Sequence, residues 1–469
     1  MSSSSRSTKA ENQVRLKLLI HKEKNIVIYA EAGKDFVDSL FSFLTLPLGH
    51  IVRLAGEESN IPAVRVGCLT TLYQSVAKLH NECLRNEICK DMLLHPRNMP
   101  MELYRQKLKL NVSRSEALNY FSSSDACSCL SAFKNVSCFC GSLTSYRSIT
   151  ASSGEYENGF VKENNFIICD DLYVMPNAIS NSLPLLQKHG VQNINHVLEK
   201  TVIVSKKELL DLLKCSLLSK TPLTDAFLLK KCAIPDMHGC YPELPELDIR
   251  QLPNDSGINF DVNVILSKSN KKVLMVQAEE DFANFILSFL TYPLGGLLNI
   301  LQRSPSSSCL EQLNKSLHFL LREDKYFTSH YLQDLLAHPP CTYIGYKADN
   351  GTLVITTYLA SMLYDPFYYK FNAHVSSSYY RRIEFEGFVK GPCKFTVTDD
   401  LVVNQMFSGA CLSFINGADA SAISDLEQRT LRIGLKECFS ILKASFSHSA
   451  LTNGLLRHLE TTIKQEKKP

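Results

Sequence analysis

The 469-residue sequence lacks several features that would assign it to a familiar class of protein. No apolar run approaches the roughly 18 uninterrupted residues that a membrane-spanning helix needs. The polar opening, MSSSSRSTKAENQ, is not followed by the apolar segment of a secretory signal. Charge of one sign is not in excess, because 50 Lys and Arg face 47 Asp and Glu and leave a net charge of +3. We therefore expect no membrane span and no bulk nucleic-acid binding.

Catalytic signatures are missing as well. The sequence contains no G-x-S-x-G, H-E-x-x-H, G-x-G-x-x-G or kinase pattern. Its composition, 45% hydrophobic and 21% charged, is nevertheless that of a globular protein. We expect an intracellular, cytoplasmic protein, with the nucleus or the plastid as alternatives. In such a compartment most of the 16 cysteines are reduced thiols that serve as small buried hydrophobes.

The dominant feature of the sequence is an internal duplication. The segment 16–49 realigns on 262–295 without a gap, so that LTLPLG reappears as LTYPLG. Further blocks recur in the same order: KDMLLHP as QDLLAHP, GFVK as GFVK, DDLYV as DDLVV, and LLKCSLLSKTPLTD as ILKASFSHSALTN. A repeat of this length predicts two whole domains rather than a solenoid.

The composition along the chain suggests boundaries for these units. We expect a disordered tail over 1–13, repeat domain 1 over 14–234 with a Cys-rich insertion at 119–158, and repeat domain 2 over 258–460. The segment 235–257 contains four prolines and reads as a stiff linker, and 461–469 reads as a second tail.

The periodicity predicts an α+β fold, a tandem duplication of an α+β domain with a ββα start and a mixed or antiparallel sheet packed against helices. Two apolar runs, 14–20 and 26–30, predict a β-hairpin. A helical stripe then begins at Asp35, and we expect Pro47-Leu48-Gly49 to end it, with the glycine as a left-handed cap. The segments 160–161 and 166–169 suggest another hairpin. Leu213 lies on the apolar face of a later helix.

These blocks, together with EAGKDFVDSLFSFLTLPLG, CFCG and DDLYVMP, resemble a plant family known as domain of unknown function 674 over nearly the whole chain. The resemblance implies a plant source and two copies of the domain. It implies no activity, cofactor or catalytic residue. Copy two departs from the pattern at Glu279-Glu280, where copy one has Gly33-Lys34, and it has no counterpart of CFCG.

Four cysteines close together give the sharpest chemical signal. Cys127, Cys129, Cys138 and Cys140 fall within fourteen positions, and two thiolate pairs on one compact loop suit a tetrahedral structural zinc. The C-x-C spacing is less typical of zinc than C-x-x-C, so ordinary unbound thiols and a redox centre stay open as alternatives. A site filled by four cysteines would leave no position for catalytic water.

Other polar motifs have structural interpretations beside the functional ones. Asp170-Asp171 and Asp399-Asp400 each follow an apolar run, but neighbouring strand residues point to opposite faces and do not form a carboxylate dyad. His95-Pro96 and its counterpart His338-Pro339 are typical of a helix end. Gly33-Lys34 is better explained as a capping turn than as an anion site.

We therefore expect a protein that binds an unknown protein partner and has no catalytic activity. The alternatives are an enzyme of unrecognised class with a site near Asp170 and Asp399, and a thiol-based sensor that uses Cys138 or Cys140. A flat, exposed apolar surface would favour the binding protein, whereas a pocket with converging carboxylates would favour the enzyme.

Overall fold

A computed structural model gives the fold of the chain. It describes residues 13–97, 99–112, 121–122, 129–135, 146–147, 159–231, 259–301, 308–339, 344–347, 353–356, 387–406 and 423–455. The predicted linker at 235–257 and the tail at 461–469 lie outside these residues, as does nearly all of the tail at 1–13. Those assignments stay predictions.

Each repeat forms its own five-stranded antiparallel sheet, and the two sheets have the same strand order. The sheet of repeat 1 has the order β7-β6-β2-β1-β8, and that of repeat 2 has the order β14-β13-β10-β9-β15. The strands of repeat 1 are β1 (Val14–His21), β2 (Ile26–Gly33), β6 (Asn165–Cys169), β7 (Val174–Pro176) and β8 (Val197–Val204). Those of repeat 2 are β9 (Asn259–Ser267), β10 (Val273–Glu279), β13 (Lys394–Thr398), β14 (Val403–Gln405) and β15 (Leu426–Gly434). The predicted duplication of an α+β domain is confirmed.

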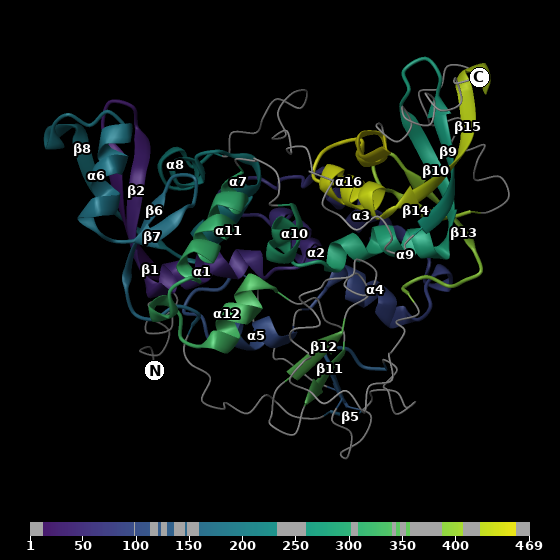
Figure 1. Cartoon of the computed structure of the whole chain (residues 1–469), viewed down its shortest axis with the longest axis horizontal. Helices are drawn as coiled ribbons and strands as arrows, with labels where there is room; N and C mark the ends of the chain where they lie inside the picture. Colours follow the sequence, from purple (N-terminus) through teal and green to yellow (C-terminus); the bar gives the residue numbers. More distant parts are fainter. Residues whose placement is uncertain are drawn as a thin grey trace, which may run out of the picture.

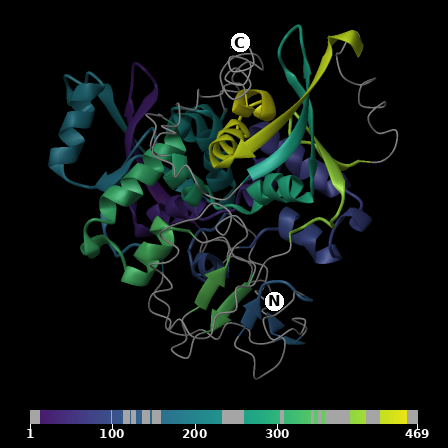
Figure 2. The same cartoon turned by 45° about the vertical axis from the view of Figure 1, so that its right-hand side comes forward.

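Most helices of both repeats lie between the two sheets, which stand at opposite ends of the molecule, whereas the helix over residues 179–188 packs on the outer face of the repeat 1 sheet (Figures 1 and 2). Repeat 1 contributes α1 (Lys34–Leu44), α2 (Leu48–Ala55), α3 (Gly67–Lys78), η1 (Asn81–Cys83), α4 (Glu87–Leu94), α5 (Met99–Gln106), α6 (Ile179–Lys188), η2 (Ile194–His196), α7 (Lys206–Leu218), α8 (Pro222–Thr224) and η3 (Asp225–Leu229). Repeat 2 contributes α9 (Glu280–Ser288), η5 (Phe289–Thr291), α10 (Leu294–Leu301), α11 (Cys309–Leu320), η6 (Asp324–Tyr326), α12 (His330–Ala337), η7 (Ile423–Asp425) and α16 (Leu435–Ala444).

A third, smaller sheet draws strands from both repeats. Its order is β12-β11-β4-β3-β5, so that a strand of repeat 2 pairs with one of repeat 1 at its centre. The strands are β3 (Phe121–Ser122), β4 (Cys129–Ser131), β5 (Tyr146–Arg147), β11 (Ile344–Lys347) and β12 (Leu353–Thr356). The two repeats are therefore joined by backbone pairing as well as by side-chain packing.

Local sequence signals explain the elements that were predicted. The hairpin of β1 and β2 and the helix α1 form where the hydrophobic period changes from two to 3.6 residues. Helix α7 begins with a capping box in which Ser205 and Glu208 bond each other's backbone. Leu213 on this helix is fully buried, as its position on the apolar face predicts.

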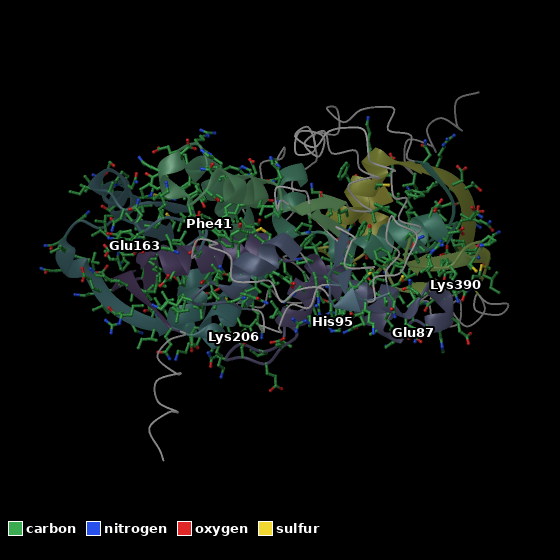
Figure 3. All side chains as sticks on the ribbon, turned by 90° about the horizontal axis from the view of Figure 1, so that it is seen from below. Phe41, Glu87, His95, Glu163, Lys206 and Lys390 are labelled. Carbon is green, nitrogen blue, oxygen red and sulfur yellow. The ribbon has the colours of Figure 1, made fainter. Side chains whose placement is uncertain are left out.

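The central helices are exchanged between the repeats. Leu84 of repeat 1 forms an antiparallel bridge with Val389 of repeat 2, and Phe327 of repeat 2 forms the matching bridge with Val161 of repeat 1. The predicted hairpin of 160–161 with 166–169 is wrong for this reason, because the backbone of Val161 pairs with the other repeat. Seen from below, Glu87 of repeat 1 lies beside Lys390 of repeat 2, far from Glu163 (Figure 3).

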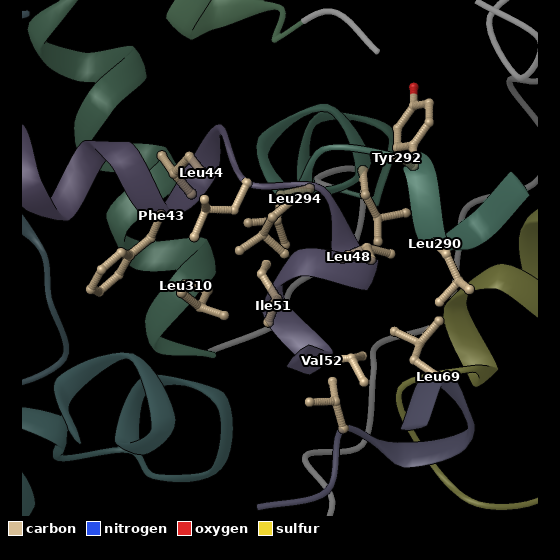
Figure 4. Close-up of a cluster of buried hydrophobic side chains, with 14 of the residues drawn as sticks. Phe43, Leu44, Leu48, Ile51, Val52, Leu69, Leu290, Tyr292, Leu294 and Leu310 are labelled. Atoms are coloured by element: carbon tan, nitrogen blue, oxygen red, sulfur yellow. The ribbon is translucent and has the colours of Figure 1, made fainter. Parts of the chain in front are cut away.

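The exchange begins where the two LTxPLG segments meet. Pro47 and Pro293 form an isolated antiparallel bridge. The Leu48 N–H donates to the Tyr292 carbonyl at 2.9 Å, and the Leu294 N–H donates to the Leu46 carbonyl at 3.0 Å. These bonds are reciprocal, so an internal two-fold relation passes through this point. Buried side chains of both repeats, including those drawn in Figure 4, form one continuous core around it.

Gly49 and Gly295 allow this close approach. A Cβ on Gly49 would lie 3.0 Å from the Leu290 carbonyl oxygen, and one on Gly295 would lie 2.9 Å from the Leu44 carbonyl oxygen. The prediction of Gly49 as a left-handed helix cap is therefore wrong. Gly49 lies inside α2, and the motif retains glycine because backbone from the other repeat occupies the space of a side chain.

We expect Gly49→Ala to lower the free energy of unfolding by about 1–3 kcal/mol, because the new methyl group meets a backbone carbonyl that cannot rotate away. An alanine in a helix normally raises stability by up to about 1 kcal/mol over glycine. A loss of stability on this substitution would therefore identify the steric contact with the carbonyl. Urea denaturation measures the change. Gly296→Ala is the matched control, since its Cβ meets mainly the Tyr292 ring. Equal effects at both positions would contradict the proposed role of Gly49.

Candidate functional site

The predicted zinc cysteines fall mostly outside the described part of the chain. Cys127, Cys138 and Cys140 are not among the described residues. Cys129 lies in β4, where its Cα is paired with that of Tyr346 in β11. Within the described residues, no group of three or more His, Cys, Asp or Glu side chains is placed to hold a metal ion. The zinc site therefore stays a prediction.

Most described thiols are buried, as expected for small hydrophobes. Burial raises the pKa of Cys68 and of Cys169 to about 12 and raises that of Cys309 and Cys438 still further. Such thiols remain protonated near neutral pH and react slowly. These four positions therefore offer packing rather than thiol chemistry.

Asp170 and Asp399 perform the same structural task in the two repeats. Asp170 accepts hydrogen bonds from the backbone N–H and the hydroxyl of Thr224, at 2.9 and 2.5 Å. Asp399 accepts the same pair from Thr452, at 2.7 and 3.0 Å. Each threonine hydroxyl also accepts from a strand N–H: that of Val27 in β2 for Thr224, and that of Val273 in β10 for Thr452. The two carboxylates belong to different sheets and are not brought together.

The Gly33-Lys34 segment also forms an internal contact. Helix α1 begins at Lys34, whose ammonium lies 3.0 Å from the Asp38 carboxylate. The Asp38 Oδ1 accepts from the N–H groups of Phe160 and Val161, at 2.8 and 2.9 Å, and so holds the GFVK segment. Burial raises the pKa of Asp38 to about 6, although the charge of Lys34 opposes this shift.

Repeat 2 builds the same contact with a neutral amide as the acceptor. Asn284 stands in the place of Asp38, and its Oδ1 accepts from Phe388 and Val389 at 2.7 and 3.0 Å. Glu280 stands in the place of Lys34, and its carboxylate accepts instead from the Cys393 N–H at 3.3 Å. A neutral amide beside a glutamate avoids the repulsion that two carboxylates would have there. The departure at Glu279-Glu280 is thus compensated inside the fold.

The histidine motifs close helices, as predicted. His95 and His338 are the C-cap residues of α4 and α12. His95 is exposed and its Nδ1 lies 2.8 Å from Asp91. The prolines that follow have a packing role that the sequence did not indicate. At the two-fold junction, Pro96 lies beside Gly49 and Pro339 lies beside Gly295.

The main unexplained surface feature is a concentration of exposed aliphatic side chains in residues 179–203 of repeat 1. Of the eight large hydrophobic side chains that are exposed among the described residues, five lie in this segment. They belong to α6, η2 and β8, at the end of the molecule remote from β15 (Figure 1). They are Ile179, Leu183, Ile194, Leu198 and Ile203. Single exposed apolar residues are ordinary, but a concentration of them typically marks a contact surface.

Strand β8 is also the open edge of its sheet. It pairs with β1, and no second strand pairs with it among the described residues. Leu198 is 46% exposed and Ile203 is 58% exposed. In the register with β1, Leu198 shares a face with Ile20, whereas Ile203 shares the opposite face with Arg15. The edge therefore exposes an aliphatic side chain on each face of the sheet.

The second repeat shows that the apolar character of this edge is not required by the fold. Strand β15 occupies the same edge of its sheet and leads into the equivalent helix, α16. In β15, Glu427 corresponds to Leu198 and Arg432 corresponds to Ile203. Charged residues are the usual protection of an open sheet edge. The sequence analysis does not identify Leu198 and Ile203. Alignment of β8 with β15 would have identified them, because it shows charged residues in their place in repeat 2.

Charges at the centre of β8 complete the surface. Glu199 and Lys200 occupy adjacent positions of the strand, and the Glu199 carboxylate lies 3.0 Å from the Lys17 ammonium on β1. The hydrogen bond to Glu199 raises the pKa of Lys17. The β8 edge, defined here as residues 197–204, thus carries an acidic and a basic residue between two aliphatic ones.

The Asp38 contact generates a pH-dependent prediction. A carboxyl whose pKa is raised in the folded state keeps a proton that the unfolded chain loses between about pH 4 and 6, so its contribution to stability falls as the pH rises through that window. Asp38→Asn removes this decline in the free energy of unfolding, which amounts to about 3 kcal/mol for a pKa shift of about two units. Urea denaturation at several pH values measures the difference between variant and wild type.

The reverse exchange is the control. Asn284→Asp places a buried carboxylate where repeat 2 has Glu280 in place of the lysine, and we expect it to cost about 3 kcal/mol or more at pH 7. Equal costs for the two substitutions at pH 7 would contradict the assigned role of the Lys34–Asp38 pair.

None of the helices within the described ranges has the length and apolar character that crossing a bilayer requires. Comparison with curated proteins and with solved structures gave no match. The family described as "Protein of unknown function (DUF674)" matches residues 10–436. This match includes every strand of both large sheets. Because it covers far more than half of the sequence, the chain belongs to the family of proteins of unknown function DUF674.

Proposed function

We propose that this protein is a non-catalytic intracellular binding protein of a plant, cytoplasmic in location, which captures an extended segment of a partner protein along the β8 edge. The observation that carries the proposal is the aliphatic pair Leu198 and Ile203 on an open edge strand that repeat 2 protects with charges. An extended segment can add to such an edge through main-chain hydrogen bonds, while side-chain contacts supply specificity.

The charges of the β8 edge define the chemistry of the partner. Residues directly opposite in neighbouring strands interact, so Glu199 favours a basic residue and Lys200 an acidic one. Leu198 and Ile203 favour aliphatic residues. An antiparallel partner read from its N-terminus therefore has the pattern apolar, any, any, acidic, basic, apolar. A segment of this kind is the occupant that we propose.

A second copy of the chain cannot place Glu199 opposite Lys200 at this edge. In a two-fold antiparallel pair, opposite residues share a face of the sheet, so their numbers differ by an even amount. Glu199 then cannot stand opposite Lys200 of the other copy. Pairings centred on either residue place like charges together, which is unfavourable. The charge pattern thus favours a different protein.

We expect a synthetic peptide with this pattern to bind the full-length protein at least about tenfold more tightly than a peptide with its acidic and basic residues exchanged, a difference of about 1.4 kcal/mol. The double variant Leu198→Glu, Ile203→Arg gives β8 the residues of β15 and should lose this binding. Fluorescence anisotropy of labelled peptide measures both. Thermal denaturation should be unchanged, because both side chains are exposed.

The matched control is the reverse pair in repeat 2, Glu427→Leu with Arg432→Ile, which leaves the β8 edge intact and should retain the binding of the wild type. Equal affinity of the β8 double variant and the wild type for the peptide would overturn the proposed edge. So would an absence of preference between the two peptides.

A structural zinc held by Cys127, Cys129, Cys138 and Cys140 is a further part of the proposal, supported by the spacing of the four thiols. We expect elemental mass spectrometry of protein purified without a metal-affinity tag to find about one zinc per chain. The double variant Cys138→Ser, Cys140→Ser should lose it. Absence of zinc with freely titratable thiols would reject the site.

A further inference from the structure

Two thiols from different repeats meet at one side-chain amide. Cys83 ends η1 in repeat 1, Cys393 directly precedes β13 in repeat 2, and Gln405 ends β14. The Cys83 thiol donates to the Gln405 Oε1 at 2.8 Å, and the Gln405 Nε2 donates to the Cys393 sulfur at 3.2 Å. Both cysteines are free thiols. One carboxamide thus holds two sulfurs that are 310 positions apart in the sequence.

The backbone on both sides of the pair is fixed by the exchange between repeats. The Lys390 N–H donates to the Cys83 carbonyl at 2.9 Å, and Leu84 forms the antiparallel bridge with Val389. On the other side, the Cys393 N–H donates to Glu280. The two thiols are therefore held by ordered backbone and face the same amide.

The amide gives the two sulfurs different roles. Cys83 is 2% exposed and donates its proton to the amide oxygen, which favours the neutral thiol. Burial and the neighbouring Cys393 raise the pKa of Cys83. Cys393 is partly exposed, and its sulfur accepts the Gln405 Nε2–H. An oxidant in the solvent therefore reaches the Cys393 sulfur before the buried Cys83 sulfur.

The reciprocal contact of the fold has no thiols. There the Lys162 N–H donates to the Tyr326 carbonyl at 2.8 Å, as the Lys390 N–H does to Cys83. Asn164 precedes β6 as Cys393 precedes β13. The same backbone contact is built without cysteine, so packing in this fold does not require the pair.

We propose that Cys83 and Cys393 form a reversible disulfide between the two repeats when the protein is exposed to a peroxide. The Cys393 thiolate attacks one peroxide oxygen, the O–O bond breaks, and a sulfenic acid and water form after protonation. The Cys83 sulfur then attacks the sulfenic sulfur, and a second water leaves with the proton of the thiol. In total, two thiols and one hydrogen peroxide give one disulfide and two waters.

The test is peptide mapping of the full-length protein after mild treatment with hydrogen peroxide and blocking of the remaining thiols. Tryptic peptides 79–85 and 391–394 each contain one cysteine, so a linked pair that is two hydrogens lighter than the sum identifies the bond. We expect this species in the wild type and in Cys89→Ser, a control whose thiol is buried in the adjacent helix α4. We expect it to disappear with a reductant.

Further variants test whether the native arrangement of Cys83, Cys393 and Gln405 promotes the disulfide. Cys83→Ser and Cys393→Ser each remove the linked peptide. Gln405→Leu keeps both thiols and should slow disulfide formation about fivefold, because no amide then holds the two sulfurs in place. Failure to detect the linked peptide while both cysteines are singly oxidised or alkylated overturns the proposal. An equal yield from protein denatured in guanidinium also overturns it, since native geometry would then contribute nothing.

Discussion

The structure depends on the approach of two backbone segments at the internal two-fold junction, where Gly49 faces the Leu290 carbonyl and Gly295 faces the Leu44 carbonyl. A side chain at either position would meet backbone of the other repeat, so the two glycines let α2 and α10 pack closely at this junction. The central helices are exchanged across it, and buried side chains of both repeats form one core. The absence of a side chain at these two positions thereby permits the close backbone approach between the repeats.

Duplication provides an internal comparison, because each contact of repeat 1 can be examined again in repeat 2. Backbone contacts are retained: the aspartate and threonine pairs, the GFVK segment and the bridges across the junction all recur. Side chains change where the retained contact permits it. Asp38 with Lys34 becomes Asn284 with Glu280, which preserves the accepting oxygen and rebalances the charge. Differences without such compensation, as on β8 and β15, are therefore the informative ones.

The sequence predicted the elements whose cause is local. The β1–β2 hairpin, α1 and the burial of Leu213 follow from the periodicity of apolar residues within a few positions. It failed where the cause is distant. The sequence predicts a helix cap at Gly49 and a hairpin at Val161, and both predictions are wrong because an apolar pattern shows that a face is buried but not which repeat buries it. In the candidate site, Leu198 and Ile203 were missed because alternation on a strand looks the same at an edge and in a core.

The two proposed sites lie on opposite sides of this exchanged architecture. The β8 edge belongs to the sheet of repeat 1, whereas Cys83 and Cys393 join the helices of repeat 1 to the sheet of repeat 2. A disulfide there would join the repeats at one exchange contact only, since Tyr326 and Asn164 occupy the corresponding positions of the other contact. The two copies have thus diverged at two places, the edge of the repeat 1 sheet and one of the two exchange contacts, whereas the reciprocal backbone bonds at the glycine junction are retained.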